Sequence, residues 1–494
     1  MYDVLKPDQK KLSAKLLPRL KSVLPRNGIL TRDAAMKPYE TDGLTAIRQM
    51  PGVVVLPETK KQLLGVLSAC RATDTPLVLR GAGTGLSGGA RPLEKGVLLV
   101  MSKFNRILEI DPENCTARVE PGVRNLAISE AGADHGLYYA PDPSSQIACS
   151  IGGNVAENAG GVHCLKYGLT VHNVIGLKVL TIEGEELELG GKTLDSPGLD
   201  LLALFCGSEG MLGVVTEITV RLLPIPPVKH LLLGAFSDIE RAGESVSEII
   251  AAGIIPAGME MMDKLAVQAA EAFVHAGYPL EAEAILLCEL DGCAEEVESD
   301  ARLVRELLQQ HGAYEVREST SDAERELMWK GRKSAFPAVG RIKPDYYCMD
   351  GTIPRSALGR VLREITALSI KYELQVANVF HAGDGNLHPL ILYDANEPGQ
   401  LEKTEEMGGK ILEYCVSVGG TITGEHGVGV EKLDQMCVQF SNQELTQFFA
   451  IKEAFDNKSL MNPGKAIPTL SRCSELGGMH VHGGVLPFPE LERF

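Results

Sequence analysis

Glycine is concentrated in two short stretches of the first third of the chain, and these stretches limit what it can fold into. The first is Gly81-Ala-Gly-Thr-Gly-Leu-Ser-Gly-Gly89, and the second is the Gly/Asn-rich stretch 152–161. The chain has 52 glycines in 494 residues, about 11% against a usual 7% or so. Because glycine has no Cβ, both stretches are predicted to be loops whose backbone approaches a flat ligand closely.

The first stretch contains Gly83-Thr-Gly-Leu-Ser-Gly88, which matches the GxGxxG pattern of dinucleotide-binding Rossmann folds. That pattern requires a helix to begin at the glycines, so that the helix N-terminus can hold a pyrophosphate. Here Pro92 and a strand-like run at 97–101 follow instead, which disfavours a Rossmann fold. A nest of consecutive backbone N–H groups binds an anion without a helix. We therefore expect a pyrophosphate site here, with a tight turn that binds nothing as the alternative.

The candidate anion ligands in this loop are the backbone at Gly81, Gly83, Gly85 and Gly88 and the hydroxyls of Thr84 and Ser87.

Charge and composition exclude several classes of partner. The formal net charge is −17, which argues against binding to nucleic acid phosphates or to anionic lipid. No apolar run approaches the roughly 18 residues of a membrane helix, and the first ten residues lack the apolar core of a secretion signal. The 11 cysteines are scattered without any CxxC spacing. This pattern favours a reducing, cytoplasmic setting and a chain with no iron–sulfur cluster of its own.

The character of the sequence changes at Pro224-Ile-Pro-Pro227, a candidate linker. Short strand-like runs dominate before it, including a hairpin with its turn at Glu183-Gly184. After it, helical periodicity alternates with strands near 284–290, 346–353 and 375–380. The pattern indicates an α+β architecture in which a sheet carries helices on one face.

The segment His381-Ala-Gly-Asp-Gly-Asn-Leu-His388 carries the strongest chemical signal. If Asp384-Gly385 forms a two-residue hairpin turn, His381 pairs directly with His388 and their Cβ atoms lie about 5 Å apart. That spacing suits a divalent metal, and Glu425 in Gly-Glu-His-Gly is the candidate third ligand. The alternative is a pair of hydrogen-bonded structural histidines.

Several motifs together resemble a known family. They are Arg80–Gly89, Pro141-Asp-Pro-Ser-Ser-Gln146, Gly207-Ser-Glu-Gly-Met-Leu-Gly213, His381–His388, Gly424-Glu-His-Gly427 and Asn462-Pro-Gly-Lys465. They are similar to segments of the vanillyl-alcohol-oxidase-type flavoproteins, and the resemblance covers about residues 30–494. Within that group the chain most resembles the FAD-linked D-2-hydroxyacid dehydrogenases, which include the FAD-linked D subunits of bacterial glycolate oxidases.

The resemblance implies a fold of three parts. Residues 1–225 would form a two-subdomain FAD-binding domain, 226–454 an α+β cap domain with an antiparallel sheet and the metal site, and 455–494 a segment that returns to the FAD domain and ends in a tail. Some relatives attach FAD covalently through His or Cys, and Cys149 and His163 flank the second stretch. We expect non-covalent FAD.

The resemblance also implies the residues that bind FAD. Besides the loop ligands named above, they are Pro141, Asp142, Ser145, Ser150, Gly153, Asn154, Asn158, Gly160, Glu209, Gly213 and Asn462.

In similar enzymes the His381, His388 and Glu425 set holds Zn²⁺ or another divalent ion. His426 would then accept the substrate hydroxyl proton, and Arg332 would bind its carboxylate. The alternatives are a merely supporting histidine and a charged surface turn. The resemblance puts Cys348 where the 2-hydroxyglutarate enzymes have a lysine, which favours a small monocarboxylate.

The implied function is FAD-dependent oxidation of glycolate or a short D-2-hydroxy acid to the 2-oxo acid, with hydride transfer to flavin N5. The alternatives are D-lactate or D-2-hydroxyglutarate oxidation, or a non-catalytic flavin-binding subunit. The resemblance implies a hetero-oligomer with a second flavoprotein-like subunit and an iron–sulfur subunit. We expect it in the cytoplasm, held at the inner membrane through those subunits, with residues 472–494 as a docking tail.

Overall fold

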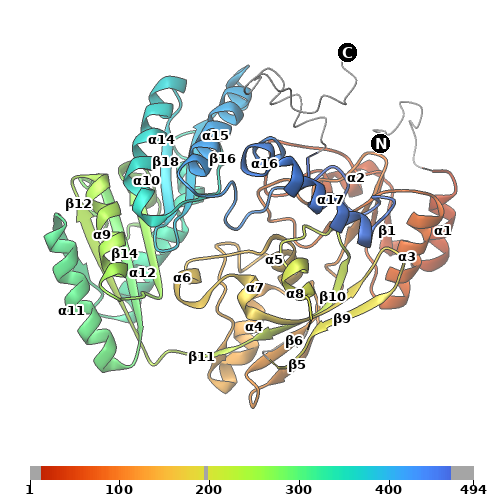
Figure 1. Cartoon of the computed structure of the whole chain (residues 1–494), viewed down its shortest axis with the longest axis horizontal. Helices are drawn as coiled ribbons and strands as arrows, with labels where there is room; N and C mark the ends of the chain where they lie inside the picture. Colours follow the sequence, from red (N-terminus) through yellow and green to blue (C-terminus); the bar gives the residue numbers. More distant parts are fainter. Residues whose placement is uncertain (1–12, 194–197, 469–494) are drawn as a thin grey trace.

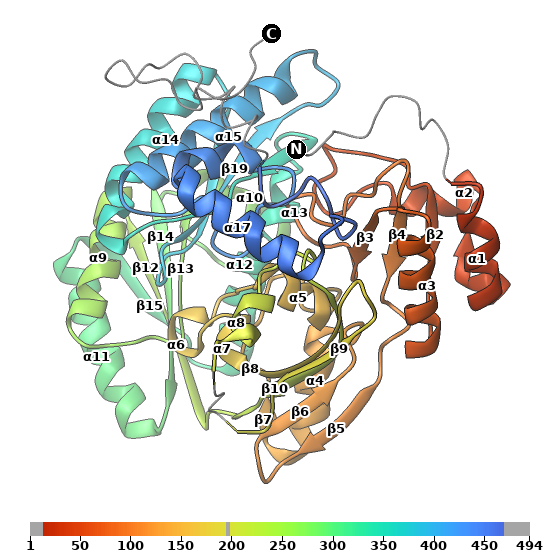
Figure 2. The same ribbon diagram turned by 45° about the vertical axis from the view of Figure 1, so that its right-hand side comes forward.

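The computed structural model describes residues 13–193 and 198–468. The proposed docking tail therefore lies outside the described residues. Figures 1 and 2 show an N-terminal half, coloured red to yellow, beside a C-terminal half that contains one large sheet. Among the described residues, no helix is long and apolar enough to cross a membrane.

The first subdomain is a small sheet with strand order β1-β2-β4-β3. Its strands are β1 (Ile29–Leu30), β2 (Val53–Val55), β3 (Leu77–Arg80) and β4 (Val97–Val100), and its main helices are α1 (Leu16–Val23) and α3 (Lys60–Ala72). β4 runs parallel to both β2 and β3. Helix α3 begins where the Thr59 side chain accepts the Gln62 N–H, a typical N-cap. Its apolar face covers the sheet, and the glycine loop 81–89 leaves the end of β3.

The second subdomain is an antiparallel sheet with strand order β5-β6-β10-β8-β9. Its strands are β5 (Ile107–Asp111), β6 (Thr116–Val119), β8 (Val174–Leu180), β9 (Glu186–Gly190) and β10 (Val214–Arg221). Burial alternates along β10, as the period of a half-buried strand requires. The predicted hairpin between β8 and β9 is present, and Gly184 takes the left-handed backbone (φ +84°) in its turn.

The prediction that 152–161 is a loop was wrong for its first half. Helix α5 spans Ile151–Glu157, and the Ser150 hydroxyl accepts the Gly153 N–H at its start. It ends at Asn158, which adopts the left-handed conformation. Glycine disfavours helix interiors, but here a serine N-cap and burial of Ile151 and Val155 outweigh that cost.

The C-terminal half is built on an antiparallel sheet with strand order β15-β12-β14-β13-β18-β19-β16. The strands are β12 (Val228–Phe236), β13 (Gly258–Asp263), β14 (Ala284–Gly292), β15 (Ala313–Glu318), β16 (Asp345–Cys348), β18 (Val376–His381) and β19 (Asn386–Tyr393), with β17 (Gly351–Thr352) paired to β19.

Helices cover both faces of this sheet rather than one. One face packs on α9 (Ile239–Ala251), α11 (Ala294–Gln310), α14 (Leu358–Tyr372) and α15 (Gln400–Ser417), and the other on α10 (Lys264–Val274), α12 (Asp322–Lys333) and α13 (Ala335–Val339). Along β12, Leu232 faces the first layer and Leu231 and Leu233 the second. The central strands are buried on both sides, so they read as continuous apolar runs without the alternation that marks a one-sided sheet.

The chain then returns to the N-terminal half. Helix α16 (Leu433–Gln439) packs against α15, and α17 (Asn442–Phe455) then leads toward the N-terminal half (Figure 1). Phe455 packs edge-on against Phe205, with ring centroids 5.3 Å apart. Beyond α17, the Leu77 N–H donates to Leu460 O and the Asn462 N–H donates to Leu77 O. The last described residues thus extend the first sheet at β3, beside the glycine loop.

Candidate functional site

A cavity of about 470 Å³ lies between the two halves. The N-terminal half lines it with backbone-rich segments from the loops that begin at residues 79 and 143 and from residues 205–215. The C-terminal half contributes six side chains, namely Lys333, Phe336, Pro337, His388, Glu425 and His426. Both halves therefore contribute ionisable side chains, and the glycines that line the cavity all come from the N-terminal half.

The glycine loop needs its glycines for two reasons. A Cβ at Gly81 would lie 2.3 Å from Ser150 Oγ, so the loop packs directly on the start of α5. Gly83 adopts φ +75°, which side chains rarely tolerate. At Gly85, by contrast, nothing lies within 4 Å of a Cβ, so this residue borders open space. The result is a cradle of backbone N–H groups, which suits a dinucleotide pyrophosphate.

Most of the predicted FAD ligands border the cavity. They are Gly81, Gly83, Thr84, Gly85, Ser145, Ser150, Gly153, Asn154, Glu209 and Gly213.

The remaining predicted ligands, Ser87, Gly88, Pro141, Asp142, Asn158, Gly160 and Asn462, are not among the cavity-lining residues. Two of them support its walls. Asn462 donates to Gly89 O and Glu209 O, and Asn158 accepts the Val171 N–H. The Asp142 carboxylate instead faces the His163 ring at 3.0 Å.

The hairpin register differs from the sequence prediction. His381 pairs with Asn386, and His388 pairs with Val379, so the connection has four residues, 382–385. Asp384 accepts the Asn386 N–H within this turn, which fixes the longer connection. Because the shift is by two residues, both imidazoles still point to the same face of the sheet. Their ring centroids lie 4.9 Å apart.

Three imidazoles surround one oxygen of the Glu425 carboxylate. Glu425 Oε1 lies 2.9 Å from His388 Nε2, 3.4 Å from His381 Nε2 and 3.6 Å from His426 Nε2. Glu425 Oε2 is buried without a hydrogen-bond partner in the described part of the chain. Burial alone would raise the pKa of Glu425, but hydrogen bonds from His381 and His388 hold it well below its usual range. Two imidazoles and an ionised carboxylate are a donor set that fits a zinc-like divalent ion.

A second buried carboxylate, Glu260 on β13, contacts both the histidine cluster and Arg332. It lies 2.6 Å from His381 Nδ1 and 2.5 Å from an Arg332 nitrogen. A carboxylate on Nδ1 leaves Nε2 free to bind a metal. Arg332 is only 1% exposed and is not a cavity-lining residue, while its neighbour Lys333 is. Arg332 Nε makes no hydrogen bond among the described residues.

The Gly-Glu-His-Gly segment is fixed by one carboxylate from each half of the molecule. Asp350, which follows β16, accepts the backbone N–H groups of Gly424, Glu425 and His426 at 2.9–3.3 Å and faces Lys432 at 3.2 Å. In the N-terminal half, Glu209 accepts the N–H groups of residues 428 and 429, each at 2.7 Å. His426 is therefore held at a set position relative to the wall that the N-terminal half contributes to the cavity.

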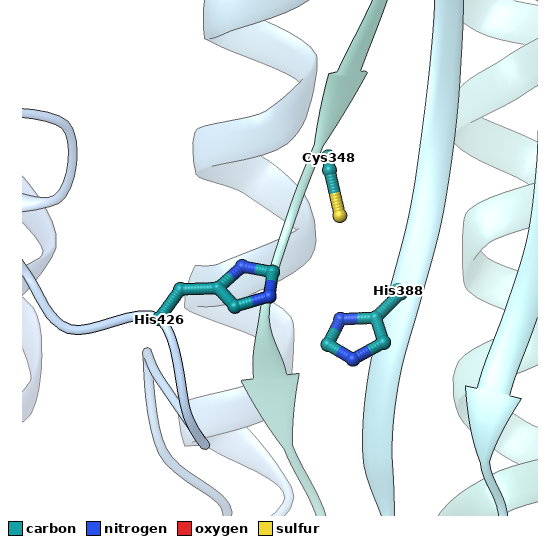
Figure 3. A group of neighbouring side chains, drawn as sticks. All are labelled: Cys348, His388 and His426. Atoms are coloured by element: carbon teal, nitrogen blue, oxygen red, sulfur yellow. The ribbon is translucent and has the colours of Figure 1, made fainter. Parts of the chain in front are cut away.

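His426 has the properties of a neutral imidazole. Burial lowers the pKa of His426 to about 4, so the ring carries no charge at neutral pH. The ring stacks on His388 with centroids 4.9 Å apart and planes within 6°. Figure 3 shows both rings with the Cys348 side chain directed toward them.

Comparisons with known proteins identify the family of the whole chain. Residues 51–190 match the model of an FAD binding domain, and residues 225–466 match the C-terminal domain of FAD linked oxidases. The chain is 64% identical over 479 residues to glycolate oxidase subunit GlcD of Escherichia coli strain K12, covering 97% of this chain and 96% of that protein. The chain belongs to the FAD-linked oxidase family. It is an FAD-linked oxidoreductase.

Other members of the family extend the comparison. This FAD-linked oxidase is 40% identical to glycolate oxidase subunit GlcD of Bacillus subtilis, over 86% of this chain and 91% of that protein. It is 34% identical to D-lactate dehydrogenase of Archaeoglobus fulgidus, over 87% and 95% respectively. Among solved structures, p-cresol methylhydroxylase superposes with a TM-score of 0.78 at 18% identity, over 92% of this chain and 97% of that chain. That likeness shows the predicted fold of the vanillyl-alcohol-oxidase type.

Sequence reasoning missed Glu260 and Asp350, and it selected Arg332 rather than the adjacent Lys333 as the cation for the substrate carboxylate. Glu260 lies in an apolar strand and Asp350 after one, so each is a charge placed where burial is expected. A charged residue within or directly after an apolar run was the sequence signal that could have identified these two residues. Lys333 follows Arg332 directly, and only the three-dimensional structure shows which of the two borders the cavity.

Proposed function

We propose that this enzyme oxidises glycolate, or another short D-2-hydroxy acid, to the 2-oxo acid. The observation that carries the proposal is that His388, Glu425 and His426, which form one cluster with His381, border the same cavity as the glycine loop. A protein that only bound flavin would have no need of such a cluster. The names of the relatives support glycolate first and D-lactate second.

The glycine loop and the start of α5 would bind FAD through backbone N–H groups, without a covalent link. When bound, FAD supplies the acceptor for the hydride that leaves C2 of the acid. Asn462 and Glu209 would act indirectly: Asn462 holds the loop at Gly89, and Glu209 ties the FAD-side wall to residues 428–429.

His381, His388 and Glu425 would hold a divalent metal ion, with zinc the best match to the donor set. Such an ion, when bound, polarises the substrate oxygen and makes the hydroxyl more acidic. His426 is neutral, borders the cavity and is held rigidly, so it would accept the hydroxyl proton on its ring. Glu260 would keep His381 in the tautomer that binds metal.

A carboxylate on the substrate requires a cation. Arg332 would bind it through the guanidinium nitrogens that Glu260 does not use, since a planar fork matches a carboxylate. Lys333, which borders the cavity, would add a second positive charge near the carboxylate. Phe336 and Pro337 add bulk to the same wall. The family resemblance puts Cys348, which is buried and does not border the cavity, where the 2-hydroxyglutarate enzymes have a lysine. Both features favour a small monocarboxylate over 2-hydroxyglutarate.

Reduced flavin must pass its electrons on, and we propose that other subunits accept them. The E. coli and B. subtilis relatives are named as subunits, and this chain has no CxxC for a cluster of its own. The expected partners are a second flavoprotein-like subunit and an iron–sulfur subunit on the cytoplasmic side of the membrane. Isolated protein should then reduce its flavin with substrate but turn over slowly with oxygen. Oxygen turnover as fast as flavin reduction would refute the need for partners.

The function is tested by supplying purified, FAD-loaded protein with glycolate and an artificial electron-accepting dye. Trapping of the 2-oxo acid as its hydrazone, in amounts equal to the dye reduced, is the expected result. Dye reduction without the 2-oxo product, or equal product from the His426→Asn variant, would contradict the proposal.

A further inference from the structure

A thiol lies against the back of the histidine cluster. Cys348 on β16, His388 on β19 and His426 in the 424–429 segment each offer one ligand atom, and these atoms all lie within 4.8 Å of one another. Figure 3 shows the three side chains converging from three different elements. Cys348 and His388 are 4% and 2% exposed.

Two ring nitrogens at this point have no partner. His388 turns Nε2 to Glu425, and its Nδ1 is buried without a hydrogen bond in the described part of the chain. The same holds for His426 Nδ1. A buried imidazole nitrogen without a partner is costly, and such nitrogens are free to bind a metal.

We propose that Cys348, His388 and His426 form a second metal site, selective for soft, thiophilic divalent cations such as Cd²⁺, and that its occupation inhibits the enzyme. The inhibition rests on the proposed functions of His388 and His426, whereas the binding itself does not. An ion held here would engage the ring of His426 and one ligand of the catalytic metal at the same time.

The ligand chemistry separates this site from the one at Glu425. One thiolate and two imidazoles favour soft ions, while a site with a carboxylate accepts harder ones. Bonds of about 2.0–2.3 Å to a tetrahedral ion place its ligands roughly 3.5 Å apart, so a closing movement of about 1 Å suffices. With zinc on Nε2 of His388, the cation replaces two protons, that of the Cys348 thiol and that on Nδ1 of His388, and both pass to solvent. Metal–sulfur and metal–nitrogen bonds form, the His388 ring bridges the two ions as an imidazolate, and no oxidation state changes.

The cavity gives the cation a route to the site. His388 and His426 both border it, although Cys348 does not. The approach therefore leads past the end of the cavity where the acid is proposed to bind. Bound substrate should slow or weaken cation entry.

The test uses FAD-loaded enzyme with one equivalent of zinc already bound, titrated with Cd²⁺. Wild type should bind one Cd²⁺ with a new thiolate-to-metal absorption in the ultraviolet and lose turnover in parallel. Cys348→Ser and Cys348→Ala should lack that absorption and raise the Cd²⁺ concentration for half-inhibition by at least about tenfold, the scale of losing one ligand. Cys288→Ser, a buried thiol in the same sheet, is the matched control and should behave as wild type.

Two results would overturn the proposal. One is wild-type enzyme that binds Cd²⁺ without thiolate absorption, a measurement that requires no variant to fold. The other is inhibition of Cys348→Ala at the wild-type Cd²⁺ concentration. If the enzyme proves inactive with every 2-hydroxy acid, the proposed function fails, but the absorption titration still decides whether this site exists.

Discussion

Replacing Glu260 by glutamine removes a buried charge that two functional side chains share. Glu260 and Arg332 are both nearly inaccessible, and their closest atoms are 2.5 Å apart. Breaking a buried ion pair by removing one partner typically costs about 3–5 kcal/mol, because the other charge stays buried. Glutamine keeps the shape and one acceptor oxygen, so we expect the lower end, about 3 kcal/mol, and a fall in Tm on the order of 5 °C.

The same substitution should weaken metal binding without touching a metal ligand. Glu260 lies 2.6 Å from His381 Nδ1 and orients the ring. Loss of such an outer partner usually costs about 10–100-fold in metal affinity. Because the glutamine oxygen can still accept the Nδ1–H, we expect about tenfold, measured by chelator competition on FAD-loaded protein.

Glu289→Gln is the matched control for this prediction. Glu289 is an equally buried carboxylate on neighbouring β14, and it pairs with Trp329 Nε1 and His163 rather than with the metal cluster. It should lower the Tm and leave metal affinity unchanged. Wild-type metal affinity in Glu260→Gln, or an equal loss in Glu289→Gln, would refute the reasoning.

Three further predictions follow from the same contacts. His381→Ala or His388→Ala should each remove bound metal and most activity while FAD is retained, and full metal occupancy by elemental analysis would count against the site. His426→Asn should slow anaerobic flavin reduction by about 10²-fold or more, the scale of lost general-base catalysis, while the metal content changes little. An unaltered single-turnover rate would mean that a group other than His426 accepts the hydroxyl proton. Burial opposes the charge on His163, but Asp142 and Glu289 raise the pKa of His163 to about 10. The stabilisation of the fold by the charged His163 ring is thus fully present below the unfolded pKa of about 6.5 and is lost as pH rises toward 10. The Tm advantage of wild type over His163→Gln should therefore shrink across pH 6.5–10, and a constant or growing difference would contradict this assignment.

Local patterns in the sequence were enough to locate the two ends of the site. The glycines of 81–89 are neighbours in sequence, and so are His381 and His388. Within each of these two groups the spacing limits the conformations that the backbone can adopt. The parity of the hairpin placed both imidazoles on one face even though the register was wrong by two residues. Turn length was the uncertain part, because Asp384-Gly385 fits both a two-residue and a longer turn.

The features that the sequence could not supply depend on contacts between distant segments. Glu260 and His381 are 121 residues apart, and Glu209 and Val428 are 219 apart. No local periodicity reports such pairs. Helix α5 was missed for a related reason, since glycine-rich composition outweighed the single N-cap signal at Ser150. Arg332 was expected at the substrate, and only tertiary packing shows its ion pair with Glu260.

Anaerobic stopped-flow mixing of the FAD-loaded enzyme with glycolate, D-lactate, L-lactate and D-2-hydroxyglutarate tests the central claim most directly. The proposed function predicts rapid bleaching of the flavin absorption by glycolate or D-lactate, and much slower bleaching by L-lactate and by the dicarboxylic acid. Removal of the metal should abolish the rapid phase, and its return should restore it. A flavin that no short 2-hydroxy acid reduces, or one reduced equally fast without the metal, would contradict the account.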